Sequence, residues 1–192
     1  MFYVYYIYME SKAFYKSIKK HNLKENYIGS ALARKYKANL HFNSSENLSK
    51  WDYLLYSLDD SWLCSCEQKE DNVCASEDDN LCFELFTFNQ DGTKRLGAIN
   101  KTKAKYIIYV ITKMKLILSL DTKKIKDLIA LHQSEGVLKT YVPNNFDAWR
   151  AKHDTAPTEC ALMNYNDVVL AAQSSVFHYN DLNINSIIYN GF

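Results

Sequence analysis

Hydrophobic and polar residues alternate with a period of two along much of this chain, which is the pattern of β-strands with one buried face. Strands are predicted over residues 1–9, 51–58, 61–70, 81–88, 106–111 and 115–120. The acidic turn Asp59-Asp60 joins the second and third of these strands as a β-hairpin, and the last two strands form another hairpin. A β-sheet is therefore expected in the middle of the chain.

Other segments repeat their apolar residues at three- and four-residue steps, which is typical of helices with one buried face. Helices are predicted over residues 10–20, 23–36 and 122–132. Asp121 or Thr122 caps the last helix, because short polar side chains accept hydrogen bonds from the free N–H groups of a first turn. His41 and the polar residues 43–47 are expected in a loop. The sequence thus predicts an α/β fold, with a mixed central β-sheet flanked by α-helices.

Composition narrows the class of protein. The 192 residues are enough for one globular domain, and 47% of them are hydrophobic. The apolar residues 1–9 are too few to cross a bilayer and include no basic residue, so we expect neither a signal peptide nor a membrane span. Five cysteines at irregular spacing do not indicate a disulfide framework. The expected location is a reducing cytoplasm, or the host cytoplasm if the protein is virus-encoded.

The predicted hairpin brings acidic and basic side chains close together. In a strand through residues 63–69, alternate side chains share a face, so Glu67 and Lys69 point the same way. Asp52 stands near the start of the preceding strand. An arrangement of this kind can hold a divalent cation beside a proton donor.

These residue types fit the hydrolysis of a phosphodiester. Mg²⁺ takes one or two carboxylates from a protein and fills its remaining positions with water and substrate phosphate, and Asp52 and Glu67 can supply the carboxylates. Lys69 can position the attacking water or stabilise negative charge in the transition state. We therefore predict a metal-dependent nuclease site. The alternative is a surface ion pair between Glu67 and Lys69.

Residues 94–105 form a strongly basic segment. It contains no acid and five cations, which are Lys94, Arg95, Lys101, Lys103 and Lys105. Because the net charge of the whole chain is only +1, a nucleic acid would have to be bound by a local basic patch of this kind. We predict that the segment contacts the phosphate backbone, with Lys103 foremost. The alternative is a solvated charged surface.

The order of these motifs resembles that of the PD-(D/E)XK nuclease superfamily, particularly its small phage-type and restriction-like members. The matching residues are Trp51-Asp52, Cys66-Glu67-Gln68-Lys69-Glu70-Asp71, Asn80-Leu81-Cys82-Phe83-Glu84, Leu96-Gly97-Ala98-Ile99 and Thr102-Lys103-Ala104-Lys105-Tyr106. Two positions depart from the family pattern, since no Pro precedes Asp52 and Lys105 stands where an Asp is usual.

The resemblance implies a restriction-endonuclease-like core over residues 1–132 and a site that uses Mg²⁺ or Mn²⁺. Its catalytic residues would be Asp52, Glu67, Lys69 and Glu25, and its metal ligands would be Asp52, Glu67 and Glu84. Glu25 is the candidate for the acid that such nucleases carry on their first core helix. The alternatives are that Glu25 complements a helix dipole and that Glu84 is a charge at the rim of the sheet.

The function that this resemblance implies is endonuclease activity on DNA. The alternatives are a metal-dependent endoribonuclease and a non-catalytic module on the same fold that binds nucleic acid or protein. Residues 133–192 resemble nothing that we can assign, and we expect them to pack on the core as an element for specificity or for homodimer formation.

Overall fold

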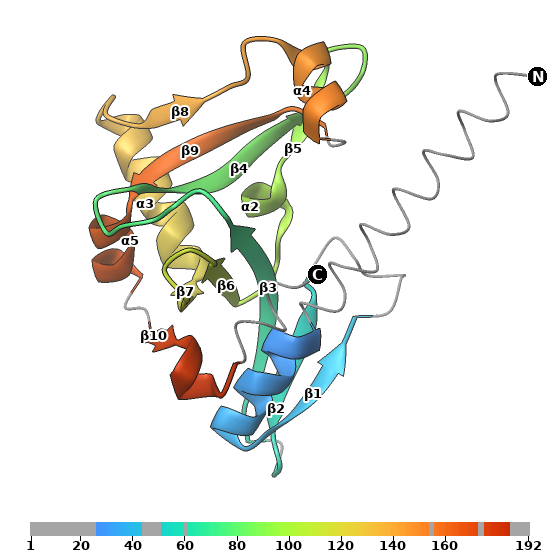
Figure 1. Cartoon of the computed structure of the whole chain (residues 1–192), viewed down its shortest axis with the longest axis vertical. Helices are drawn as coiled ribbons and strands as arrows, with labels where there is room; N and C mark the ends of the chain where they lie inside the picture. The colour runs from blue at the N-terminus through green and yellow to red at the C-terminus, as the bar shows by residue number, and fades with distance from the viewer. Residues whose placement is uncertain (1–25, 44–50, 60, 154–155, 173–174, 185–192) are drawn as a thin grey trace, which may run out of the picture.

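The computed structural model describes residues 26–43, 51–59, 61–153, 156–172 and 175–184. Within these segments the chain forms two β-sheets (Figure 1). One has six strands in the order β1-β2-β3-β6-β7-β10, and the other has four strands in the order β5-β4-β9-β8. Both sheets carry residues from the first and the second half of the chain.

The strands of the six-stranded sheet are β1 (Ala38–Phe42), β2 (Tyr53–Ser57), β3 (Leu63–Asp71), β6 (Tyr106–Ile111), β7 (Leu116–Asp121) and β10 (Ser175–His178). Those of the four-stranded sheet are β4 (Asn80–Phe88), β5 (Lys94–Leu96), β8 (Lys139–Tyr141) and β9 (Thr158–Asn164). Residues 26–36 are helical, and the further helices are α2 (Ala98–Lys101), α3 (Thr122–Ser134), α4 (Phe146–His153), α5 (Tyr165–Ala171) and the 3₁₀-helix η1 (Tyr179–Leu182).

The predicted α/β class is confirmed, because the larger sheet is mixed and helices cover its faces. Strands β3 and β6 run parallel, whereas each other neighbouring pair in that sheet is antiparallel. Both predicted hairpins are present, as β2–β3 and β6–β7. The predicted cap of α3 is also present, since the Asp121 carboxylate accepts a hydrogen bond of 3.1 Å from the Lys124 N–H.

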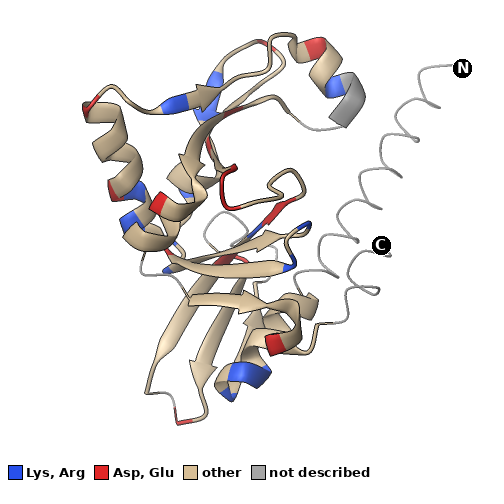
Figure 2. Cartoon of the chain, turned by 60° about the vertical axis from the view of Figure 1, so that its left-hand side comes forward, with Lys and Arg blue, Asp and Glu red and all other residues tan. Residues whose placement is uncertain are grey.

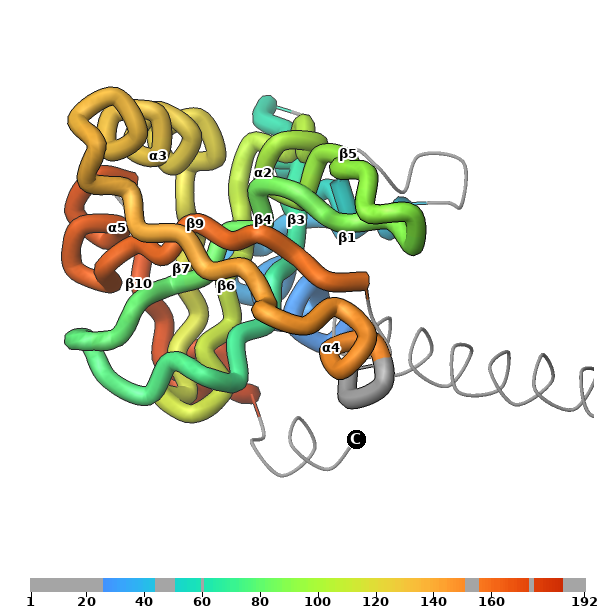
Figure 3. The backbone as a smooth tube through the Cα atoms, turned by 90° about the horizontal axis from the view of Figure 1, so that it is seen from above, coloured from blue at the N-terminus to red at the C-terminus, as the bar shows by residue number. Residues whose placement is uncertain are grey.

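The middle of the six-stranded sheet is buried on both faces, which explains why β6 is apolar throughout and β7 is apolar except at Ser119 and Asp121. On one face Tyr109 and Leu118 pack in a core shared with α3, α5 and the four-stranded sheet. On the other face Ile108 and Ile117 pack in a core shared with helix 26–36. Figure 3 shows α3 and α5 together at one end of the molecule and α4 at the opposite end.

A buried hydrogen-bond network joins the two sheets. The Tyr109 hydroxyl on β6 donates to Asp71 Oδ2 at the end of β3 over 2.7 Å, and it accepts from the Cys82 N–H of β4 over 2.9 Å. The other Asp71 oxygen accepts from the N–H groups of Val73 and Cys74. Tyr109 is fully buried and Asp71 is 7% exposed, so each of these polar groups depends on its partner within the protein.

Two expectations about the N-terminal half change. His41 lies in strand β1 rather than in a loop, because Leu40 and Phe42 on either side of it pack against the core under helix 26–36. The expected strand 1–9 and helix 10–20 lie outside the described residues.

The last third of the chain is part of both sheets rather than an extension that packs on a finished core. Strand β9 pairs with β4, and β10 pairs with β7 at the edge of the larger sheet. Strands on either side of the expected boundary after residue 132 are thus hydrogen-bonded to each other. Within the described segments, no helix is both long enough and apolar enough to span a membrane.

The hydrogen-bond network between the sheets predicts that removal of the Tyr109 hydroxyl destabilises the fold. Tyr109→Phe leaves the Asp71 carboxylate and the Cys82 N–H without their buried partner, which lowers the free energy of unfolding by about 1–3 kcal/mol. Urea titration followed by circular dichroism measures this change. Tyr141→Phe is the matched control, since that side chain is 46% exposed. Equal effects of the two substitutions would contradict a joining role for Tyr109.

Candidate active site

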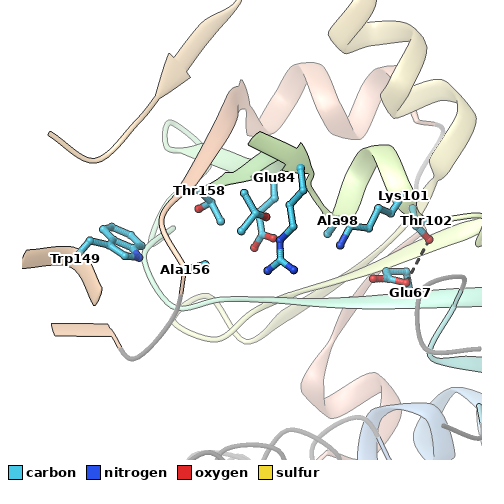
Figure 4. A pocket seen from close by; sticks show the side chains of 10 residues that line it. Glu67, Glu84, Ala98, Lys101, Thr102, Trp149, Ala156 and Thr158 are labelled. Carbon is cyan, nitrogen blue, oxygen red and sulfur yellow. Dashed lines mark hydrogen bonds between the residues drawn. The ribbon is translucent and has the colours of Figure 1, made fainter. Parts of the chain in front are cut away.

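Glu67 and Lys69, two of the predicted catalytic residues, line cavities between the two sheets. Figure 2 shows several acidic positions near the middle of the molecule. The larger of these cavities has a volume of about 430 Å³. Its lining residues are Glu67, Glu84, Thr87, Arg95, Ala98, Lys101, Thr102, Trp149, Ala156 and Thr158 (Figure 4). An adjoining cavity of about 180 Å³ shares Glu67 and Glu84 and adds Lys69.

Strand pairing brings Asp52 to Glu67. Asp52 directly precedes β2, and its N–H donates to the Cys66 carbonyl over 2.8 Å. Its carboxylate accepts the N–H of Gln68, with 2.5 Å between Gln68 N and Asp52 Oδ2. Since Cys66 and Gln68 flank Glu67 on β3, both bonds hold the Asp52 carboxylate beside that residue.

The Glu67 side chain is half-buried and accepts a hydrogen bond from the Thr102 hydroxyl, with 3.3 Å from Oγ1 to Oε2. Thr102 is only 3% exposed, and its hydroxyl also accepts the Ala104 N–H. Burial and the neighbouring negative charge of Asp52 raise the pKa of Glu67 to about 7. A cation between the two carboxylates would relieve this repulsion.

Lys69 forms an ion pair with Glu84 of β4 across the interface between the sheets, and each side chain is 27% exposed. Burial by itself disfavours the ammonium, but the Glu84 carboxylate outweighs it and holds the pKa of Lys69 above its ordinary value. Lys69 is therefore protonated at neutral pH, two residues from Glu67 on the same strand.

The donor set fits one Mg²⁺ or Mn²⁺ ion bound by two carboxylates. In the part of the chain that the structure describes, no three His, Cys, Asp or Glu side chains converge as a ready-made metal cluster. Mg²⁺ needs only one or two protein carboxylates, because water and phosphate complete its shell. Asp52 and Glu67 meet this need. Glu84, the third expected ligand, is instead the partner of Lys69.

A close contact at Gly97 places helix α2 beside the site. Gly97 donates its N–H to the Leu85 carbonyl over 2.8 Å, and a Cβ at this position would overlap the Glu84 carbonyl group. The Asn100 side chain donates to the same Leu85 carbonyl over 2.8 Å. Glycine is therefore required for β4 and α2 to approach, and this approach brings Lys101 and Thr102 to the cavity that Glu84 lines.

Of the five residues expected to contact nucleic acid, two line the cavity and three do not. Arg95 and Lys101 line the cavity. Lys94 points to the other side of β5, where it pairs with Glu159 over 2.6 Å. Lys103 and Lys105 are exposed but do not line the cavity, because they alternate with the buried Thr102 and Ala104 along an extended segment. Glu25, the expected acid of the first helix, lies outside the described residues.

Several lining residues were not expected from the sequence. Thr158 on β9 and Trp149 on α4 come from residues 133–192, in which no individual site residue was predicted. A β-bulge between Glu84 and Phe86 places Thr87, rather than Phe86, in the cavity beside Glu84. Strict alternation along residues 81–88 predicts instead that Phe86 shares a face with Glu84. No residue type in that strand indicates the bulge.

No protein-family model, no curated protein and no solved structure matches this chain significantly. A function is therefore argued from the motifs of the sequence and from the arrangement of side chains.

The raised pKa of Glu67 predicts how stability changes with pH. Because its pKa is 4.5 when unperturbed and about 7 in the folded protein, the folded state binds more protons between these values. The stabilisation is complete below about pH 4.5 and is lost as the pH rises through 7. One pKa unit is worth about 1.4 kcal/mol, and solvent screens this half-buried group, so the loss is about 1–3 kcal/mol.

Glu67→Gln removes this part of the pH dependence in metal-free protein, and urea unfolding at pH 5 and pH 8.5 measures it. The exposed Glu135→Gln is the isosteric control and keeps the parent profile. Mg²⁺ or Mn²⁺ at pH 8.5 should stabilise the parent more than Glu67→Gln. An unchanged profile in Glu67→Gln would contradict the electrostatic account of this site.

Proposed function

We propose that this protein is a metal-dependent nuclease that hydrolyses phosphodiester bonds, with DNA as its substrate and RNA as the alternative. One observation carries the proposal: Glu67, with the Asp52 carboxylate held beside it, lines one cavity with the cations Arg95 and Lys101 and an adjoining cavity with Lys69. The motif order described above supports the same function. The five cysteines are all free thiols, which suits a reducing compartment such as the cytoplasm.

Asp52 and Glu67 would hold the Mg²⁺ or Mn²⁺ ion. When bound, such an ion polarises a phosphoryl oxygen and lowers the pKa of its water. Arg95 and Lys101 line the cavity where they can bind the phosphate that flanks the cut. Hydrolysis joins a water oxygen to phosphorus, breaks the bond to the leaving oxygen and delivers a proton to that oxygen.

Lys69 is the residue that we assign to the developing charge of the transition state. Its ion pair with Glu84 keeps the amine protonated and fixes the side chain between β3 and β4. A protonated amine in a partly buried site stabilises negative charge without a large rearrangement of its surroundings. Glu84 is thus a positioning residue for Lys69 in this mechanism.

Cleavage assays on single-stranded and duplex DNA and RNA, with Mg²⁺, Mn²⁺ or EDTA, test the function. The parent is expected to cut in metal and not in EDTA, and Lys69→Met should lower the rate by about 100-fold or more. The double variant Lys69→Met/Glu84→Gln removes the unpaired carboxylate and should remain inactive. Lys123→Met, on the exposed surface of α3, is the control for loss of one positive charge and should match the parent.

Two results would contradict the proposal. Activity that returns in the double variant would assign the ion pair a structural role. Binding of nucleic acid without cleavage in any metal would favour the non-catalytic module. The expected homodimer stays a prediction that gel filtration can address.

A further inference from the structure

We propose that the 430 Å³ cavity accepts one unstacked nucleotide, with its base against Trp149, and that the protein therefore acts on unpaired strands rather than on intact duplex. This inference rests on the nuclease function proposed above and specifies its class of substrate. The depth of the catalytic groups, the size of the cavity and the chemistry at its two ends support it.

The catalytic groups are recessed between the sheets. Lys69 and Glu84 are each only 27% exposed, and Glu67 is half-buried beneath Thr102. A cavity of about 430 Å³ has the size of a small-molecule site and not that of a groove for a double helix. In a duplex each phosphate is tied to a stacked and paired base. It can enter such a recess only if its nucleotide leaves the stack, which is easiest when the nucleotide is already unpaired.

The two ends of the cavity carry different chemistry. In Figure 4, Glu67 and Thr102 lie at one end with Lys101, Trp149 lies at the opposite end, and Glu84 and Thr158 lie between them. The end near Glu67 suits a phosphate with its cation. The indole at the other end suits a base, since every base has a π-face that stacks on aromatic side chains. One nucleotide, with a phosphate and a base at its two ends, matches this order.

Contacts within the protein hold Trp149 in place. The Trp149 and Tyr141 rings lie 6.3 Å apart with an interplanar angle of 51°, which links α4 to β8. On the same helix, the Arg150 guanidinium donates to the Asn89 carbonyl over 2.8 Å and ties α4 to the β4–β5 turn. The helix is therefore anchored at two places beside the cavity. An anchored indole is a preformed stacking surface, so a base that binds there requires little rearrangement of the protein.

The charge of the lining also favours a nucleotide once the paired groups are counted. Glu84 is neutralised by Lys69, and a divalent cation at Asp52 and Glu67 offsets both of those carboxylates. Arg95 and Lys101 then remain as positive charges in the cavity. The hydroxyl groups of Thr87 and Thr158 add neutral hydrogen-bond partners for a sugar or a base edge. Since a hydroxyl can both donate and accept, these contacts do not depend on one particular base.

Binding measured without catalysis separates this inference from the nuclease proposal. The probes are a 12-nucleotide single-stranded DNA and a hairpin whose blunt duplex stem contains the same 12 bases. Both are titrated with Ca²⁺ in place of Mg²⁺ and followed by tryptophan fluorescence and by anisotropy of a labelled strand. The parent should bind the single strand at least tenfold more tightly than the hairpin. Trp149→Ala should weaken binding of the single strand by about 5- to 150-fold, the range expected for one stacked base.

Two further variants keep the test decisive. Trp149→Phe retains an aromatic face and should stay within a few-fold of the parent. Trp62→Ala removes a tryptophan that lines a different cavity, with Leu32 of helix 26–36, and should bind as the parent does. Equal affinity for hairpin and single strand, or unchanged binding by Trp149→Ala, would overturn the inference and leave the nuclease proposal intact. Selective binding to the single strand without cleavage in any metal would instead overturn the nuclease proposal alone.

Discussion

The hydrogen bonds of the Tyr109 hydroxyl to Asp71 and to the backbone of Cys82 are the constraint on which the site depends. They fix the end of β3, the middle of β6 and the start of β4 relative to one another in a buried environment. Two residues along β4 from Cys82 stands Glu84, and two residues along β3 from Asp71 stands Lys69. The network therefore sets the distance over which the Lys69–Glu84 ion pair forms. The chemistry of the cavity follows from this joint between the sheets.

The electrostatics of the site are dominated by two neighbouring carboxylates, those of Asp52 and Glu67. Strand pairing holds Asp52 beside Glu67, and burial together with the negative charge of Asp52 raises the pKa of Glu67 to about 7. Lys69 cannot fully relieve the repulsion between them, because Glu84 holds the ammonium. We propose that a divalent cation between the two carboxylates offsets this repulsion. Buried structural acids such as Asp71 differ, since backbone N–H groups and a hydroxyl already satisfy their oxygens.

The sequence was informative wherever the information was local. The period-two alternation of residues 51–70 predicted the β2–β3 hairpin, and the hairpin places Asp52 beside Glu67. Long-range pairing was not predictable in this way, because no local pattern shows that Cys160 of β9 lies opposite Glu84 or that Tyr109 reaches Asp71 across 38 residues. For the same reason Trp149 was not anticipated. The bulge after Glu84 moves the later residues of β4 to the opposite face of the strand, and no residue type in the sequence indicates it.

The central claim is that Asp52 and Glu67 together bind a divalent cation beside Lys69. Diffraction from crystals grown with Mn²⁺, collected at a wavelength where manganese scatters anomalously, tests it most directly. The account predicts an anomalous peak about 2.0–2.3 Å from a carboxylate oxygen of each residue, with water or phosphate completing the shell. The absence of a peak at this position, or a peak coordinated by other side chains, would contradict it.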